Sequence, residues 1–428
     1  MVKPESTGTV ARNTLWMFCG LGLRLVIQAL YFVVIARSLG ASGYGAFIGV
    51  VALVGIVYPF GDLGSGGLLV KNVSRDQNQF PGYWGTALLT TGASSSVLFL
   101  AVLALSHFTL PAAIPLRLVL LVSGSDLVGL NVITMCGQAF QAFDRLHWTA
   151  TINVLVSASR LAAALILVAI QRHPSPLQWG YVYFFSTSLV AIAAVLMVST
   201  NLGYPRFGWQ RAPGEVREGF YFSTGLSAQT IYNDLDKTML ARLGTLEATG
   251  IYGAAYRLID VSFVPVSSLL TASYSNFFRA GADGISASLS YAKPLLLRAL
   301  GYSVLACITL LVCAGIIPRI LGAEYARTVE AVRWLSVLPI LKVLHYFYSN
   351  ALTGAGYQAL RTKIQVGVAI FNVLVNFWLI PAYSWRGAAW SSIASDGLLA
   401  CGIGLAAFVL FRRSQNLLLN ATVNAETD

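Results

Sequence analysis

Charged side chains interrupt several long apolar stretches of this sequence, and they are the first residues with the means to do chemistry. Six are basic and six are acidic: Arg24, Arg160, Lys237, Arg257, Arg333, Lys342, Asp62, Asp126, Asp234, Asp236, Asp260 and Asp396. A charge at the centre of a membrane helix costs about 2.5–3.5 kcal/mol on insertion scales, so such residues face the protein interior or water. Their formal sum is zero, which leaves open whether they neutralise one another or serve a ligand.

Spacing divides these charges into two groups, because residues three or four apart share one face of a helix. Asp234 with Lys237, and Arg257 with Asp260, predict ion pairs within a helix. Arg24 has no acid within one turn. Three polar stripes at helical spacing predict instead the lining of a wet cavity: Arg24, Gln28 and Tyr31; Asn153, Ser157 and Arg160; Lys342, His345 and Tyr346.

The elements that position these residues are membrane helices. Of the 428 residues, 56% are hydrophobic and only 11% are charged, against about 25% charged in an ordinary soluble domain. Apolar runs of about 18 residues are long enough to cross a bilayer. The sequence predicts an all-α integral membrane protein with about 12 transmembrane helices. The expected spans are 13–36, 44–69, 83–107, 115–140, 148–170, 179–201, 219–242, 250–276, 294–318, 328–352, 363–383 and 387–411.

The distribution of basic residues predicts the orientation. Of the 28 Lys and Arg, fifteen lie in the connections or next to them on the side of the N-terminus, and seven on the other side. By the positive-inside rule both termini are cytoplasmic, as an even number of crossings requires. The net charge of +11 is therefore a topology signal, and nucleic acid is not an expected partner. The first apolar stretch is too long for a signal-peptide core and is expected to remain as a helix.

An internal repeat predicts two halves. ARSLGASGYGA from Ala36 is echoed by ARLGTLEATGIYGA from Ala241, and INVLV from Ile152 by FNVLV from Phe371. The most hydrophilic connection lies midway along the chain. We therefore expect an N-terminal lobe of six helices at 1–201, a cytoplasmic linker at 202–218 and a C-terminal lobe of six helices at 219–428. Because each half has an even number of crossings, the two share one orientation, which favours a binding site between the bundles.

Several segments resemble a known family. They are NTLW from Asn13, ARSLGASGYGAF from Ala36, GDLGSGGLLVKNVSR from Gly61, DKTMLARLGTLEATGIYGAAYRL from Asp236, LGAEYARTVEAVRWL from Leu321 and IPAYSWRGAAWSSIASD from Ile380. The chain is similar to O-antigen-type polysaccharide flippases, in the superfamily that includes multidrug and toxin extruders and the lipid II flippase. The resemblance implies two six-helix lobes forming a V, alternating access, and a lipid-linked oligosaccharide as substrate in a bacterial inner membrane. The resemblance does not specify which glycan this protein carries, because members of the family differ in their glycans.

The implied substrate carries a pyrophosphate, which needs fixed cations in a low-dielectric core. Arginine suits this task because its planar fork donates two parallel hydrogen bonds to phosphate oxygens. Arg24, Arg160 and Lys342 are the foremost pyrophosphate-binding candidates. The wider set adds the remaining basic residues of the spans: Lys237, Arg257 and Arg333.

Neutral polar groups suit the sugars, and titratable groups suit coupling to an ion. The sugar-contacting candidates are Asn131, Gln138, Asn153 and Asn372, with ordinary hydrogen bonding between helices as the alternative. The candidates for proton or sodium coupling are Asp62, Asp126, Asp396 and His345, each with a structural alternative. Six tryptophans near span ends are expected to be interfacial anchors: Trp16, Trp84, Trp148, Trp179, Trp385 and Trp390.

Other functions remain as alternatives. A cation-coupled multidrug exporter of the same superfamily would present acids and aromatic rings to cationic drugs instead of bases. A membrane polysaccharide polymerase or ligase would need a large outer loop, and the longest outer connection is only about 171–178. No cofactor, metal site or disulfide is expected, because the five cysteines show no C-x-x-C pairing and no GxxxxGK[ST] phosphate loop occurs. Other polysaccharide-assembly proteins are candidate partners.

Overall fold

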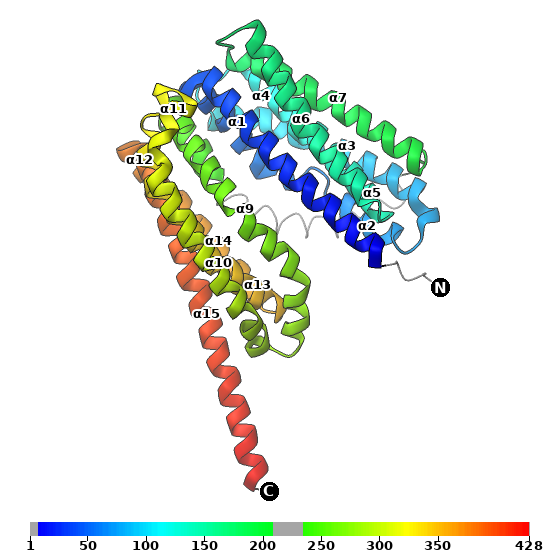
Figure 1. The fold of residues 1–428 in the computed structure, drawn as a ribbon, viewed down its shortest axis with the longest axis vertical. Helices are drawn as coiled ribbons and strands as arrows, with labels where there is room; N and C mark the ends of the chain where they lie inside the picture. The colour runs from blue at the N-terminus through cyan, green and yellow to red at the C-terminus, as the bar shows by residue number, and fades with distance from the viewer. Residues whose placement is uncertain (1–6, 209–233, 428) are drawn as a thin grey trace. The chain divides into compact units, whose positions relative to one another are not determined.

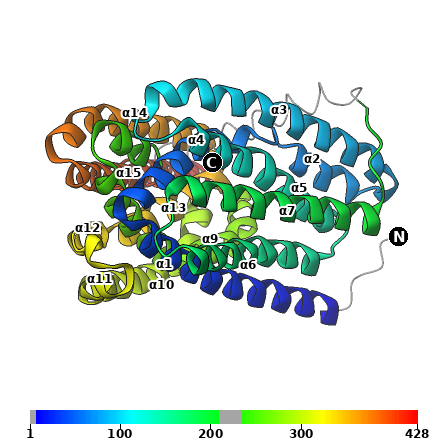
Figure 2. The same cartoon turned by 90° about the horizontal axis from the view of Figure 1, so that it is seen from above.

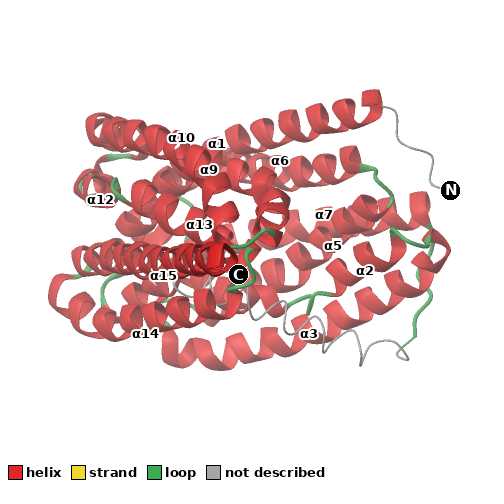
Figure 3. Ribbon diagram, turned by 90° about the horizontal axis from the view of Figure 1, so that it is seen from below, coloured by secondary structure: helices red, strands yellow, loops and turns green. Residues whose placement is uncertain are grey.

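The structure is a computed structural model that describes residues 7–208 and 234–427, with side chains for 22–208 and 234–416 apart from residue 275. The described residues form helices joined by short turns, and no strand occurs among them (Figure 3). The helices are α1 (Thr7–Val57), α2 (Ser65–Val73), α3 (Phe80–Thr109), α4 (Leu116–Ser123), α5 (Asn131–Ala142), α6 (Leu146–Ile170), α7 (Pro176–Leu202), α9 (Leu246–Ala282), α10 (Ile285–Cys313), α11 (Ile317–Leu321), α12 (Thr328–Leu335), α13 (Leu338–Gly354), α14 (Gln358–Tyr383) and α15 (Trp385–Thr427).

Many of these helices are long and apolar enough to cross a membrane. Within the described residues there are 8 such spans, or up to 9 if the bent helix α9 is included. The all-α membrane fold is therefore confirmed. The expected count of 12 stays a prediction, because the expected span 13–36 and much of 44–69 fall within α1, where two helices join at a kink. Their junction is Gly40, whose φ of 68° interrupts the helical backbone, a conformation that glycine adopts without the steric penalty of a Cβ.

The chain forms two compact units, residues 1–250 and 251–428. The expected linker at 202–218 lies mostly outside the described residues. The helical residues 234–243 and the first turn of α9 belong to the first unit. A Cβ on Gly45 of α1 would overlap the carbonyl oxygen of Leu246, and one on Gly250 would overlap that of Ala41. The two echoed segments thus contact each other backbone to backbone, which only small residues permit.

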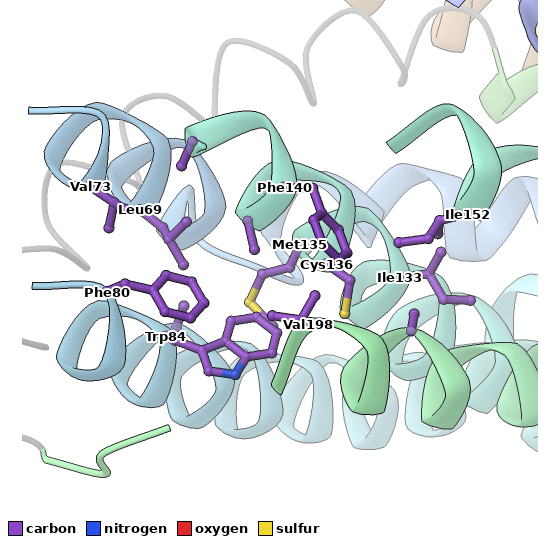
Figure 4. Close-up of a cluster of buried hydrophobic side chains, with 14 of the residues drawn as sticks. Leu69, Val73, Phe80, Trp84, Ile133, Met135, Cys136, Phe140, Ile152 and Val198 are labelled. Carbon is purple, nitrogen blue, oxygen red and sulfur yellow. The ribbon is translucent and has the colours of Figure 1, made fainter. Parts of the chain in front are cut away.

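In the first unit, α1 lies along α6 and α6 packs on α7, while α2 packs on α3 and α5 (Figures 1 and 2). A core of apolar side chains fills the space between α3, α5 and α7 (Figure 4). Phe80 and Trp84 stack with ring centroids 6.0 Å apart. Trp84 is 0% exposed and Trp179 is 1% exposed. The expectation that these two tryptophans are interfacial anchors is wrong, because both are core residues.

In the second unit, α10 packs on α13, and α15 packs on both α13 and α14. Its apolar core includes Phe277 of α9, Ala292 of α10 and Phe347 of α13. Polar side chains are also buried here, on α13, α14 and α15. These three helices carry most of the buried polar side chains in the described part of the second unit.

Candidate functional site

A buried charge centre occupies the first unit where α6 and α7 meet a π-helical segment, η3 (Gly124–Leu130). Arg160 of α6 forms an ion pair with Asp126 of η3, with Nη2 and Oδ1 3.1 Å apart. Tyr183 of α7 donates its hydroxyl to the same oxygen at 2.7 Å. Thr187, one turn further along α7, accepts from Nε and Nη2 of Arg160 at 3.2 and 3.1 Å. The guanidinium carbon lies 4.1 Å from the centroid of the Tyr183 ring, a cation–π contact.

This centre corrects the prediction for Arg160. Its stripe on α6 indicated a base facing water, whereas the guanidinium is paired with an aspartate. The acid comes from another helix, so spacing along α6 gave no sign of it. Nε and Nη2 are occupied, but Nη1 makes no hydrogen bond within the described part of the chain. Asp126, a coupling candidate, serves as the counter-ion of Arg160.

Arg24 lies beside the same face of α6. Its Nη1 donates to Oδ1 of Asn153 at 3.5 Å, which joins α1 to α6. Asn153 and Arg160 are two helical turns apart, or roughly 10 Å along the axis. The structure thus brings together two predicted pyrophosphate ligands and one predicted sugar ligand along a single strip, which we call the α6 strip: Arg24, Asn153 and Arg160.

Lys237 is paired as its spacing predicted. Its Nζ lies 2.7 Å from Oδ1 of Asp234 and 3.9 Å from Oδ1 of Asp236. The predicted Asp234–Lys237 ion pair is confirmed. A lysine between two carboxylates is a weaker candidate for an anionic ligand than the arginines of the α6 strip.

The other polar candidates of the first unit make local contacts. Asp62 accepts from the backbone N–H of Gly64 at 3.0 Å in the turn before α2. Asn131 is buried and donates to the carbonyl of Leu127 at 2.9 Å. Gln138 lies against Gly66, where any Cβ would overlap its amide oxygen. Asn131 and Gln138 thus fill the contact of α5 with residues 61–66, and their contact with sugars stays a prediction.

In the second unit Lys342 of α13 is buried, and its Nζ lies 3.6 Å from Oδ1 of Asp260 on α9. The ammonium also lies 5.0 Å from the ring centroid of Tyr256. The prediction of a wet stripe on α13 is wrong, because Lys342 and His345 are both buried. Asp260 is paired here with a residue of another helix, a contact that spacing within α9 did not predict.

His345 of α13 and Asp396 of α15, two coupling candidates, lie side by side. Nε2 of the imidazole is 3.2 Å from Oδ1 of the carboxylate, and their side chains are 0% and 5% exposed. Neither ring nitrogen of His345, nor Oδ1 of Asp396, has a well-directed hydrogen bond among the described residues. A buried polar atom without one costs about 1–3 kcal/mol, so this contact needs an explanation.

Next to this pair, a neutral polar network joins α14 to α15. Asn372 donates to Ser391 at 3.1 Å and to Ser395 at 2.9 Å, and Asn376 donates to Asn372 at 2.9 Å. The network is buried. Asn372, a predicted sugar ligand, therefore makes hydrogen bonds between helices, the alternative stated above.

The two remaining basic candidates are less enclosed. Arg257 of α9 is half-buried, and Arg333 of α12 is exposed. The structure does not bring Arg333 to the buried polar groups of α13 and α15. Its role in binding pyrophosphate stays a prediction without a supporting contact.

Sequence reasoning missed Tyr183, Thr187 and the π-helical geometry of η3. An aromatic residue and a threonine in an apolar helix give no distinctive signal, although their spacing of four places both on one face of α7. π-helical turns are rare and occur frequently at functional sites.

An apolar hollow of about 450 Å³ lies between α3, η3 and α7, lined by Phe99, Val128 and Phe184 among others. It contains none of the predicted site residues. Within the described residues, no cluster of His, Cys, Asp and Glu could hold a metal ion.

Comparison with solved structures identifies the fold. An inward-facing multidrug resistance MATE transporter of the MOP superfamily is similar with a TM-score of 0.72 and 11% identity, over 94% of this chain and 99% of that one. The lipid II flippase MurJ in an inward closed conformation has a TM-score of 0.71 and 12% identity, over 98% and 93%. A MOP superfamily transporter from Pyrococcus furiosus has a TM-score of 0.60 and 13% identity, over 94% and 95%.

The sequence comparisons define the family. No curated protein matches the chain. The family model described as polysaccharide biosynthesis protein matches residues 10–279, more than half of the sequence. This agrees with the resemblance found in the sequence and with the shared fold. The chain belongs to the polysaccharide biosynthesis protein family.

Proposed function

We propose that this protein is a flippase that moves undecaprenyl-pyrophosphate-linked oligosaccharide repeat units from the cytoplasmic to the outer leaflet by alternating access. The α6 strip carries this proposal: two partly buried arginines flank an asparagine on one face of the first unit. The family assignment supports a substrate of polysaccharide assembly. The proposed setting is the bacterial inner membrane, with both termini in the cytoplasm and other polysaccharide-assembly proteins as partners.

The chemistry of the strip suits a diphosphate. Asp126 and Thr187 fix the Arg160 fork through Nε and Nη2, and Nη1 remains to donate to an oxygen of the substrate. Because Asp126 holds the guanidinium in place, little side-chain entropy is lost on binding. Arg24 supplies a second guanidinium on the same strip. Bound sugars would replace the guanidinium of Arg24 as the partner of Asn153.

Deleting the gene tests the function itself. Lipid-linked repeat units should accumulate on the inner leaflet while their synthesis continues, and a plasmid copy should restore their export. The same fold also serves a multidrug transporter, so the alternative is a cation-coupled drug exporter. Hypersensitivity to drugs, with no accumulation of lipid-linked units, would favour that exporter and refute the flippase.

Arg24→Ala should reduce export about tenfold to a hundredfold in the complemented deletion strain. A hydrogen bond to a charged group contributes about 1.5–3 kcal/mol, and each 1.4 kcal/mol changes binding tenfold. Arg24→Lys should retain part of the activity, because a lysine keeps the charge but loses the bidentate geometry. The measurement is surface glycan per unit of membrane-inserted protein.

The matched control is Arg172→Ala, in an exposed turn between α6 and α7. This variant should export at the wild-type rate. Normal export by Arg24→Ala, at a normal protein level, would remove Arg24 from the binding site.

A further inference from the structure

The contact of His345 with Asp396 is the one buried pair of titratable groups in the described part of the second unit that the proposed substrate does not use. The atoms Nε2 and Oδ1 are 3.2 Å apart, yet neither takes part in a well-directed hydrogen bond. Nδ1 of the imidazole also has no partner among the described residues. Packing alone would favour an apolar pair at this position. The two residues therefore have the character of a site that gains and loses a small ligand.

We infer that His345 and Asp396 form the proton-binding site through which a proton gradient drives the flippase. This inference rests on the proposed function and adds its energy source. The site is formed by α13 and α15 of the second unit, whereas the α6 strip belongs to the first unit. The substrate and the proton would then bind at separate positions in the chain.

The donor set favours a proton over a metal ion. Hard cations bind through shells of several oxygen ligands, whereas this contact offers one imidazole and one carboxylate. Histidine is the side chain that commonly changes its charge between pH 5 and 8. No larger cluster of acids or histidines surrounds the pair within the described residues.

The proton balance is simple. In the unloaded state the pair holds one proton, either as imidazolium with carboxylate or as neutral imidazole with carboxylic acid, and its net charge is zero. One proton taken from the outer side gives imidazolium with carboxylic acid and a net charge of +1. Release of that proton to the cytoplasm restores the starting state. The 3.2 Å contact has a different electrostatic energy in each of the two states.

Few other charges face this site. On α13 itself, Lys342 lies one turn before His345, and the Tyr346 ring centroid is 4.3 Å from that of the imidazole. On α9, Asp260 pairs with Lys342. On the helices α10, α12 and α14 and the rest of α15, the charged side chains described are exposed or half-buried: Lys293, Arg298, Glu330, Arg333, Arg361, Lys363, Arg386, Arg412 and Arg413.

The contacts of α13 and α15 with α9 can transmit the effect of protonation at this site. A charge of +1 at His345 would repel the ammonium of Lys342 on the same helix face and weaken its 3.6 Å contact with Asp260 of α9. Ser392, one turn before Asp396, bonds to Tyr252 of α9 at 2.8 Å. Both helices that form the proton site, α13 and α15, are thus linked to α9. A two-state rearrangement of α9 would connect proton binding to the transport cycle.

Everted membrane vesicles that contain native lipid-linked repeat units test this inference. Flipping is measured as loss of glycan access to periodate added outside, with and without an acid-inside pH gradient. The gradient should speed flipping by wild-type protein about tenfold, within the ~5–150-fold range of typical couplings, and nigericin should abolish the increase. His345→Gln and Asp396→Asn should both flip at the rate that wild type shows with nigericin. Asp396→Glu should keep the response.

The control is His107→Gln, which alters an exposed histidine of α3 and should behave as wild type. A response to the gradient in His345→Gln and Asp396→Asn, or flipping by wild type that ignores the gradient, would overturn the inference while the proposed function stands. A lack of protein-dependent flipping would instead refute the function.

A second measurement does not depend on transport. The chain has 4 histidines, so ¹⁵N-histidine spectra of the reconstituted protein at one pH contain few signals, and His345→Gln identifies the one of interest. Asp396→Asn should change the protonation state of that imidazole alone. Spectra unchanged by Asp396→Asn would contradict the inference even in a variant that folds poorly enough to lose transport.

Discussion

Replacing Asp126 by alanine should lower the free energy of unfolding of the first unit by about 3–5 kcal/mol, the usual effect of removing one partner of a buried ion pair. Among the described residues, the guanidinium of Arg160 would keep its contacts with Thr187 and the face of the Tyr183 ring. Tyr183 would also lose the acceptor of its hydroxyl. Denaturant unfolding in detergent micelles, followed by circular dichroism, measures the change.

A double-mutant cycle separates pairing from packing. Asp126→Leu with Arg160→Leu should be more stable than Asp126→Leu alone, because replacing both members of a buried pair by apolar residues is often nearly neutral. Asp144→Asn is the control, since its side chain is exposed and asparagine tolerates the φ of 58° found there. Additive effects of the two leucine substitutions would show that the ion pair does not stabilise the unit.

Trp84→Ala should destabilise the first unit by about 3–5 kcal/mol, as large-to-small substitutions of core aromatics do. The indole is fully buried and stacks on Phe80, and the cluster around it joins α3 to α5 and α7 (Figure 4). Burial from water contributes less within a bilayer, so most of the effect comes from the cavity and the lost contacts. The same unfolding experiment measures it.

Trp378→Ala provides the comparison, because that side chain on α14 is 70% exposed. It should change the free energy of unfolding by less than about 1 kcal/mol. Equal effects at the two positions would mean that Trp84 contributes no more than surface contact with lipid or detergent.

Hydropathy predicted most of the fold, because an apolar segment in a membrane can satisfy its backbone hydrogen bonds by itself only as a helix. It also predicted the break between 36 and 44, where two helices meet at Gly40. It did not predict every break of this kind. The expected span 328–352 is divided into α12 and α13. Hydropathy reports burial in lipid, whereas such breaks depend on the φ and ψ of individual residues.

The candidate site was predictable only where its contacts are local. Asp234 and Lys237 are three residues apart, and their pairing follows from helix geometry. Asp126 and Arg160 are 34 residues apart. Nothing in a single sequence specifies which of several acids lies opposite a given base once the helices pack. For the same reason His345 and Asp396 were separate candidates until the structure placed them together.

Polar groups buried between helices have a consequence for how the chain is made. The buried lysine and histidine of α13 meet carboxylates on α9, translated earlier, and on α15, translated later. Stable insertion of α13 therefore depends on helices that are made both before and after it. A chain that stopped short of α15 would present an unfinished hairpin to membrane proteases.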